Sequence, residues 1–210
     1  MKLEGKKINF LGDSITQGIG VEESCNFYVN RIAERYGAVC RNYGISGTRI
    51  ARQIVPGQVT TRWDLYFELR AEIMDRNADA VVVFGGTNDY GHGDAPFGSL
   101  DSEDTYTFCG ALNSLIKKLK KDFPGKRIIF MTPLHRLGEN NPSMPDSKTL
   151  SDYVDAMVMI CKMHQVDVID LFKINPLDPA DKELVPDGLH PSDKGHSVMA
   201  EVIAEELIKL

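Results

Sequence analysis

Five short apolar runs, separated by longer segments with helical periodicity, constrain the fold of this chain more than any other feature. Each run is continuously hydrophobic rather than alternating, which is typical of strands that are covered on both faces. We therefore expect strands at residues 7–11, 38–43, 80–84, 127–132 and 167–170.

The segments between these runs predict helices. Apolar stripes start near Phe27, Leu65, Ala111, Tyr153 and Val198; the first stops before Gly37, and the third runs into four lysines, which favour a helix C-terminus. Five strand–helix units indicate an α/β fold, a three-layer α/β/α sandwich with a doubly wound parallel sheet. Such sheets carry their sites at the carboxyl ends of the strands.

The 210 residues suit one domain, 1–210, and 42% of them are hydrophobic. The formal net charge of −6 disfavours nucleic acid as a partner and, more weakly, an anionic membrane surface. No apolar run approaches membrane-spanning length, and no signal peptide is evident at the start, so we expect a cytoplasmic protein. The four cysteines form no C-x-x-C pair, and neither zinc nor redox spacing is present.

Two polar islands, one near each end of the chain, carry the elements of nucleophilic catalysis. Ser14 follows the first strand, where a helix begins, although Asp13 or Ser14 there could serve only as a helix cap. A serine hydroxyl needs a base to take its proton, and a histidine that serves as the base needs a carboxylate to orient its ring. We expect this carboxylate to be buried. Asp187 and His190, three residues apart in a Gly/Pro-rich loop, could supply both, or could form an ordinary surface loop.

Acyl transfer also needs hydrogen-bond donors for the oxyanion. Gly47 follows the second strand, where a bare backbone N–H could approach a substrate, and Asn88 follows the third strand with a side-chain amide. Each could instead be an ordinary turn residue. The joint placement of Ser14, Gly47, Asn88 and the Asp–His pair at strand ends favours the catalytic interpretation.

These four blocks together resemble the SGNH (GDSL) hydrolase superfamily, in the family's order and spacing from residue 12 to residue 190. The only departure noted is Ile15 where the founding motif has leucine. The resemblance implies a flavodoxin-like fold with a five-stranded parallel sheet and no cofactor or metal. It also implies the triad Ser14, Asp187 and His190. The implied oxyanion donors are the N–H groups of Ser14 and Gly47 and the amide of Asn88; Gly44 is an alternative to Gly47.

The implied reaction is hydrolysis of a carboxylic ester, with a small molecule or carbohydrate as the substrate. The absence of a long hydrophobic lid favours short acyl groups such as acetyl, while thioesters and lysophospholipids stay open. The two long loops at 86–102 and 133–147 are candidate cleft walls. Candidate substrate-binding residues in and around the cleft are Asp13, Arg49, Asp89, Tyr90 and His135.

Two other classes of function compete with this hypothesis. Asp13, Asn88, Asp89, His92, Asp187 and His190 are ligand-type residues that could serve a metal-dependent phosphoesterase. A non-catalytic binding module on the same fold is the second alternative, but no Gly-rich phosphate-binding loop follows the first strand.

Overall fold

The computed structural model describes residues 1–52, 65–92 and 95–210. Five parallel strands form one sheet in the order β2-β1-β3-β4-β5, so the chain first moves to one edge, returns to the centre and continues to the other edge. This is a doubly wound order of the flavodoxin type. The strands are β1 (Lys7–Gly12), β2 (Val39–Gly44), β3 (Ala80–Phe84), β4 (Arg127–Met131) and β5 (Asp167–Ile169).

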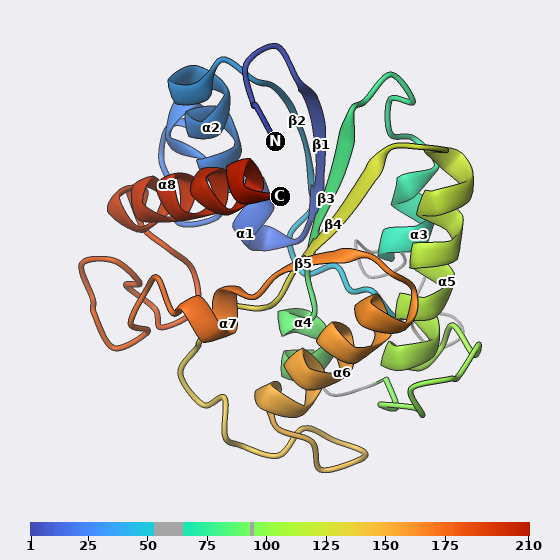
Figure 1. The fold of residues 1–210 in the computed structure, drawn as a ribbon. Helices are drawn as coiled ribbons and strands as arrows, with labels where there is room; N and C mark the ends of the chain where they lie inside the picture. Colours follow the sequence, from blue (N-terminus) through green and yellow to red (C-terminus); the bar gives the residue numbers. More distant parts are fainter. Residues whose placement is uncertain (53–64, 93–94) are drawn as a thin grey trace.

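Helices cover both faces of this sheet (Figure 1). One face carries α2 (Tyr28–Tyr36) and α8 (Asp193–Lys209); the other carries α3 (Phe67–Ala71), α5 (Phe108–Asp122) and α6 (Leu150–Met163). Short turns of helix sit in the connections: α1 (Ser14–Gln17), η1 (Ser24–Asn26), α4 (Thr87–His92) and α7 (Leu171–Ile174).

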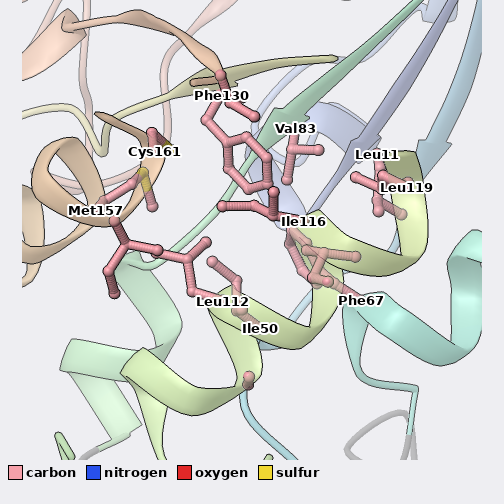
Figure 2. Packing of buried hydrophobic residues seen from close by; sticks show 14 of the residues in the cluster. Leu11, Ile50, Phe67, Val83, Leu112, Ile116, Leu119, Phe130, Met157 and Cys161 are labelled. Atoms are coloured by element: carbon pink, nitrogen blue, oxygen red, sulfur yellow. The ribbon is translucent and has the colours of Figure 1, made fainter. Parts of the chain in front are cut away.

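The sheet divides the hydrophobic core into two clusters. Along β3, Val81 and Val83 point to the α3–α5–α6 side, where Figure 2 shows Val83 among side chains of α5 and α6. Val82 and Phe84 point to the α2–α8 side. Burial on both faces explains why the strands read as unbroken apolar runs, since neither face has to be polar.

All five predicted strands are confirmed to within one residue at each end. The predicted helix before Gly37 is also confirmed: α2 ends there, and Gly37 has φ = 67°, a left-handed conformation that suits glycine. Within the described part of the chain, no helix has both the length and the apolar character needed to cross a membrane.

Two predictions along the chain are corrected. The apolar stripe predicted from Leu65 included Leu69 and Ile73, and for these two side chains the prediction was wrong. They are 40% and 74% exposed, while Arg70 in α3 is 3% exposed. The segment 86–102, expected to be a loop throughout, begins with the short helix α4. Residues 93 and 94 of that segment lie outside the described residues.

Candidate active site

Three of the predicted site residues lie at neighbouring strand ends. Ser14 follows β1, Gly47 follows β2 and Asn88 follows β3, and β1 lies between β2 and β3 in the sheet. All three strands are parallel, so their carboxyl ends meet at one edge. The sheet therefore brings the candidate nucleophile and both candidate oxyanion donors to the same edge, as the sequence predicted.

The start of α1 holds Ser14 in place. Asp13 is the N-cap of this helix, and its carboxylate accepts a hydrogen bond of 3.0 Å from the backbone N–H of Ile15. Gly12 precedes it without a side chain, because a Cβ there would lie 2.0 Å from Oγ1 of Thr16. Ser14 is consequently fixed directly after the strand, and it is 3% exposed.

A chain of two hydrogen bonds connects Ser14 to Asp187 through His190. Nε2 of His190 lies 3.0 Å from Oγ of Ser14, and Nδ1 of His190 lies 2.7 Å from Oδ2 of Asp187. An ionised carboxylate can only accept, so Nδ1 carries the proton and Nε2 is free to accept the Ser14 hydroxyl proton. The nucleophile, base and orienting acid are therefore aligned for general-base catalysis.

The loop carrying Asp187 stabilises its ionised form. Burial acts to raise the pKa of Asp187, but the N–H groups of His190 and Leu189 and the ring of His190 outweigh it, and the pKa is about 2. The side chain is nevertheless 55% exposed, so the expectation of a buried carboxylate was wrong. Local hydrogen bonds within three residues take the place of burial in keeping Asp187 charged and oriented.

The structure separates the roles of the two glycines after β2. A Cβ on Gly44 would lie 2.2 Å from the backbone N of Gln17, so Gly44 allows α1 to pack closely against β2. Gly47 has φ = 77°, and a Cβ there would meet nothing within 4 Å. The space beside Gly47 is open, and a substrate atom could approach its backbone N–H there. This favours Gly47 over Gly44 as the donor.

Asn88 lies in the first turn of α4 and contacts the Gly47 loop directly. Its Nδ2 donates a hydrogen bond of 2.9 Å to the carbonyl of Thr48, the residue after Gly47. The amide group carries a second hydrogen that this bond does not use. The side chain is therefore oriented by one N–H while the other is left for an oxyanion.

Two buried charged residues, Arg70 and Asp89, brace this loop. Both oxygens of the Asp89 carboxylate accept backbone N–H bonds, from Ile50 at 3.1 Å and from Ala51 at 2.9 Å. Arg70 in α3 donates to the carbonyls of Gly12 and Tyr43, at the ends of β1 and β2, and to the Thr48 hydroxyl at 2.8 Å. These bonds tie residues 48–51, in the described first part of the β2–α3 loop, to α4 and to both strand ends.

The sequence did not predict the role of Arg70. Three of its partners are 22 to 58 residues away along the chain, the carbonyl of Leu65 is five residues away, and within its own helix Arg70 looks like a solvent-facing cation. A polar residue inside an apolar stripe is the only local signal. Burial lowers the pKa of Arg70 to about 10, against the effect of the Asp13 charge.

Asp13 lies within electrostatic reach of both Arg70 and His190. Burial raises its pKa from 3.8 to about 6, although the bond from Ile15 and the nearby charges of Arg70 and His190 act in the opposite direction. At neutral pH the ionised Asp13 therefore lowers the free energy of unfolding of the protein.

The structure gives the predicted substrate-binding residues other partners. Asp13 and Asp89 are 1% and 0% exposed and bind backbone N–H groups, so their assignment to substrate contacts was wrong. Arg49 is 1% exposed and lies within electrostatic reach of Asp89, which likewise places it below the surface. Burial of the guanidinium lowers its pKa.

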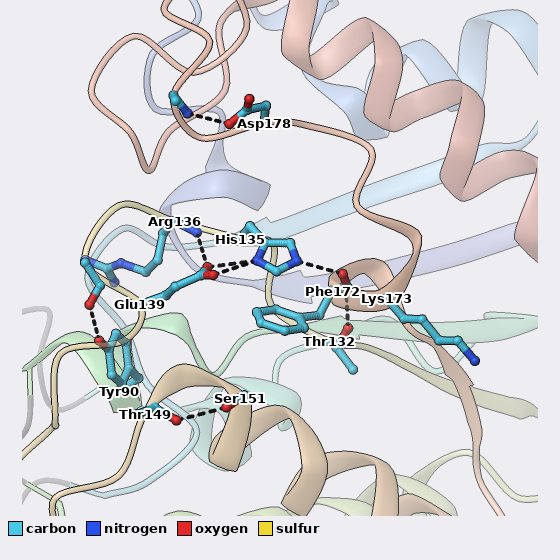
Figure 3. A network of polar contacts seen from close by, with 12 residues as sticks. Tyr90, Thr132, His135, Arg136, Glu139, Thr149, Ser151, Phe172, Lys173 and Asp178 are labelled. Carbon is cyan, nitrogen blue, oxygen red and sulfur yellow. Dashed lines mark hydrogen bonds and ion pairs between the residues drawn. The ribbon is translucent and has the colours of Figure 1, made fainter.

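His135 is also engaged within the protein. Its Nδ1 lies 2.9 Å from both carboxylate oxygens of Glu139, and its Nε2 lies 3.0 Å from the carbonyl oxygen of Phe172, on whose ring it stacks (Figure 3). With both nitrogens occupied, His135 anchors the 133–147 loop instead of contacting a substrate. Among the five candidates, Tyr90 alone lines the pocket described next.

That pocket, of about 310 Å³, lies between α4 and the 133–147 loop. The Tyr90 hydroxyl donates to the carbonyls of Gly138 and Asn141, and so fastens one wall to the other. The wall also touches the catalytic loop, because the N–H of Leu137 donates to the carbonyl of Gly188 at 2.9 Å. One wall of the pocket thus contacts the loop that carries Asp187 and His190.

The candidate metal ligands do not gather in one place. Over residues 1–52, 65–92 and 95–210, no three His, Cys, Asp or Glu side chains form a group that could hold a metal ion. The carboxylate of Asp89 is occupied by backbone N–H groups, and that of Asp187 by its own loop.

Comparison with known proteins agrees with this geometry. The model of the GDSL-like lipase/acylhydrolase family matches residues 10–198. An acetylxylan esterase of Xylanibacter ruminicola is 25% identical over 97% of this chain, which spans only 43% of that protein's length. A GDSL esterase/lipase of Arabidopsis thaliana is 26% identical and covers 96% of this chain and 86% of its own.

Solved structures agree as well. A crystal structure of a Lactobacillus plantarum protein matches with a TM-score of 0.78 at 27% identity, covering 99% of this chain and 98% of its own. The family match covers Ser14, Gly47, Asn88, Asp187 and His190. The chain belongs to the GDSL-like lipase/acylhydrolase family, a family of ester-hydrolysing enzymes.

Proposed function

We propose that this protein hydrolyses short-chain carboxylic esters, acetyl esters of carbohydrates above all, through an acyl-enzyme on Ser14. The observation that carries the proposal is the pair of hydrogen bonds at 3.0 Å and 2.7 Å that joins Ser14 to His190 and His190 to Asp187. No other serine of the described residues has a hydrogen bond to a histidine that is itself bonded to a carboxylate.

The mechanism follows from the positions of the protons. Nε2 of His190 takes the Ser14 proton while Oγ attacks the acyl carbonyl, and Asp187 stabilises the imidazolium that forms. The N–H groups of Ser14 and Gly47 and the amide of Asn88 bind the oxyanion. His190 then returns the proton to the leaving alcohol, and a water molecule repeats the cycle to release the acid and restore Ser14.

Two observations support short acyl groups and carbohydrate esters. The pocket beside the catalytic loop is small, about 310 Å³, and polar residues contribute much of its lining. A relative with 25% identity bears the name acetylxylan esterase. Lysophospholipids and thioesters remain the alternatives within the family, and the substrate series below distinguishes them.

The test is a series of nitrophenyl esters of increasing acyl length, run beside acetylated xylo-oligosaccharides, a lysophospholipid and an acyl thioester. We expect kcat/KM to fall as the acyl chain lengthens and acetate to be released from the sugars. Ser14→Ala should abolish turnover, whereas Ser114→Ala, on the surface of α5, should leave it unchanged. A fluorophosphonate should inactivate the enzyme and EDTA should not.

The opposite results would refute the proposal. If Ser14→Ala keeps most of the activity, Ser14 is not the nucleophile, and if EDTA removes activity, a metal-dependent reaction is favoured. A preference for long acyl chains would replace the acetyl-ester proposal with the lysophospholipase alternative.

A further inference from the structure

The pocket between α4 and the 133–147 loop contains a cation that the catalytic mechanism does not use. Arg136 lies in its lining, directly beside the loop that carries Asp187 and His190. Nη1 of Arg136 donates to the carbonyl and hydroxyl oxygens of Thr87, at 3.1 Å and 3.2 Å. Thr87 immediately precedes the candidate oxyanion donor Asn88, so the guanidinium binds the residue next to that donor.

The protein holds this guanidinium rigidly. Cζ of Arg136 lies 5.6 Å from the centre of the Tyr90 ring. The Tyr90 hydroxyl in turn is hydrogen-bonded to the carbonyls of Gly138 and Asn141 in the opposite wall of the pocket. Gly91 leaves the space that the group occupies, because a Cβ there would lie 2.6 Å from Nη1. The backbone of Arg136 is also fixed, since its N–H donates to Glu139 at 3.0 Å (Figure 3). An arginine arranged in advance in this way loses little side-chain entropy when it binds a ligand.

The charge of Arg136 is not paired. Among the residues that the structure describes, no carboxylate forms an ion pair with this guanidinium, and its buried Nε has no hydrogen-bond partner. The carboxylate of Glu139 binds the ring of His135 and the backbone N–H of Arg136 instead. Burial lowers the pKa of Arg136, although Tyr90 and the more distant carboxylates of Asp13 and Asp187 act in the opposite direction. Unpaired buried charges are costly, and in a pocket next to catalytic groups they point to a ligand.

We propose that Arg136 binds a carboxylate on the substrate, so that the enzyme prefers esters bearing one negative charge near the scissile bond. Both hydrogen bonds of Nη1 go to Thr87, so Nη2 is the guanidinium nitrogen that would bind the anion. Asp13 and Asp187 lie within electrostatic reach of the guanidinium, so a single charge fits better than a doubly charged phosphate. The inference rests on the ester hydrolysis proposed above.

The carboxylate could belong to either half of the ester, and two matched pairs of substrates distinguish the halves. The first pair compares an acetylated methyl glucuronide with the methyl glucoside acetylated at the same position. The charge of this pair lies on the alcohol half, as in a uronic acid. Ethyl hydrogen succinate against ethyl butyrate places it on the acyl group. In each pair the reaction is the same and only the charge changes.

In at least one pair, kcat/KM for the charged ester should exceed that for the neutral ester by about 10-fold or more. In Arg136→Gln this ratio should fall to about 1 or below, and Arg136→Lys should keep part of it. Arg35→Gln removes the same charge from α2, where Arg35 pairs with Glu201, and should leave the ratio unchanged. A purely structural role of Arg136 would slow both esters of a pair equally, and an unchanged ratio in both pairs overturns the inference.

A binding measurement separates this inference from the proposed reaction. Calorimetry with the Ser14→Ala protein should show that glucuronate or succinate binds, and that adding Arg136→Gln weakens this binding by about 10-fold or more. That result would support the carboxylate site even if no ester in the series were hydrolysed. Binding of neither anion, or binding equal with and without Arg136→Gln, would overturn the site independently of the esterase proposal.

Discussion

The catalytic loop at 186–191 and the loop between β2 and α3 each bring one part of the machinery to Ser14, and they are anchored differently. In the first, the hydrogen bonds of Asp187 within the described part of the chain go to its near neighbours Leu189 and His190, and its side chain is 55% exposed. In the second, Gly47 and Thr48 rely on Asn88, Arg70 and Asp89, which come from other elements and are 7% exposed or less.

The difference follows from what each part has to do. A base must accept and release a proton, and a short loop with its own carboxylate can orient a histidine without help from the core. An oxyanion site must hold N–H groups from different strands in a fixed arrangement, which requires bonds between distant segments. We therefore expect changes in the catalytic loop to affect activity alone, and changes around the β2–α3 loop to affect activity and stability together.

The largest effect should come from His190→Ala. Removal of the base should lower kcat/KM by about 10⁴ or more, because the Ser14 hydroxyl then keeps its proton. The free energy of unfolding should change by less than about 1 kcal/mol, since the ring is held by local contacts at the surface. Kinetics and thermal denaturation of the same preparation measure both quantities.

His164→Ala serves as the matched control, because His164 is also half-buried and hydrogen-bonded, to Asn113 at 2.7 Å, but lies at the end of α6. It should keep full activity. A large loss of stability in His190→Ala would contradict the view that the catalytic loop is independent of the core.

Asn88→Ala should have the next largest effect, this time on both quantities. Loss of an oxyanion donor should lower kcat by about 10²–10³. The Thr48 carbonyl loses its partner as well, which should cost about 1–2 kcal/mol of unfolding free energy. A kcat within a few-fold of the wild-type value would exclude Asn88 from the oxyanion site.

Asp89→Asn tests the support of the β2–α3 loop without touching a reacting group. An amide can accept only one of the two N–H bonds that Asp89 accepts, and its NH2 would face the other donor. We expect a loss of about 2–3 kcal/mol in stability and a decrease in kcat of about 10-fold as the loop shifts. Asp155→Asn, exposed on α6, should change neither, and normal activity in Asp89→Asn would show that the loop does not need this brace.

The same contrast explains how far the sequence could be interpreted. The five strands are visible because two covered faces require unbroken apolar runs, and that signal lies within each strand. Asp187 and His190 were found because their bond spans three residues. The bracing roles of Arg70 and Asp89 were not predicted, because their bonds to the residues after β2 span at least 22 residues of the chain.

Asp13, at the start of α1, lies within electrostatic reach of His190 in the catalytic loop and of Arg70 beside the β2–α3 loop. Asp13→Asn should have the smallest effect on activity and stability but the most informative pH dependence. In the folded state the pKa of Asp13 is raised from 3.8 to about 6. Below pH 3.8 the side chain is protonated in both the folded and the unfolded protein, and the wild type then has its full stability. Part of this stability is lost as the pH rises through about 6. The variant should therefore match the wild type near pH 3.5 and exceed its unfolding free energy by about 1–3 kcal/mol above pH 6.5.

The asparagine oxygen can still accept the bond from Ile15, so the start of α1 should be retained. Activity should nevertheless fall a few-fold at neutral pH, because the Asp13 carboxylate lies within electrostatic reach of His190 and stabilises the positive charge that forms there when the Ser14 proton is transferred. Denaturant unfolding at several pH values and kcat at pH 7.5 would measure the two effects. A gain in stability that is independent of pH would show that Asp13 is not titrating, and unchanged activity would show that its charge does not assist His190. A gain in stability with a loss of activity would mean that the buried charge behind Ser14 is kept for catalysis.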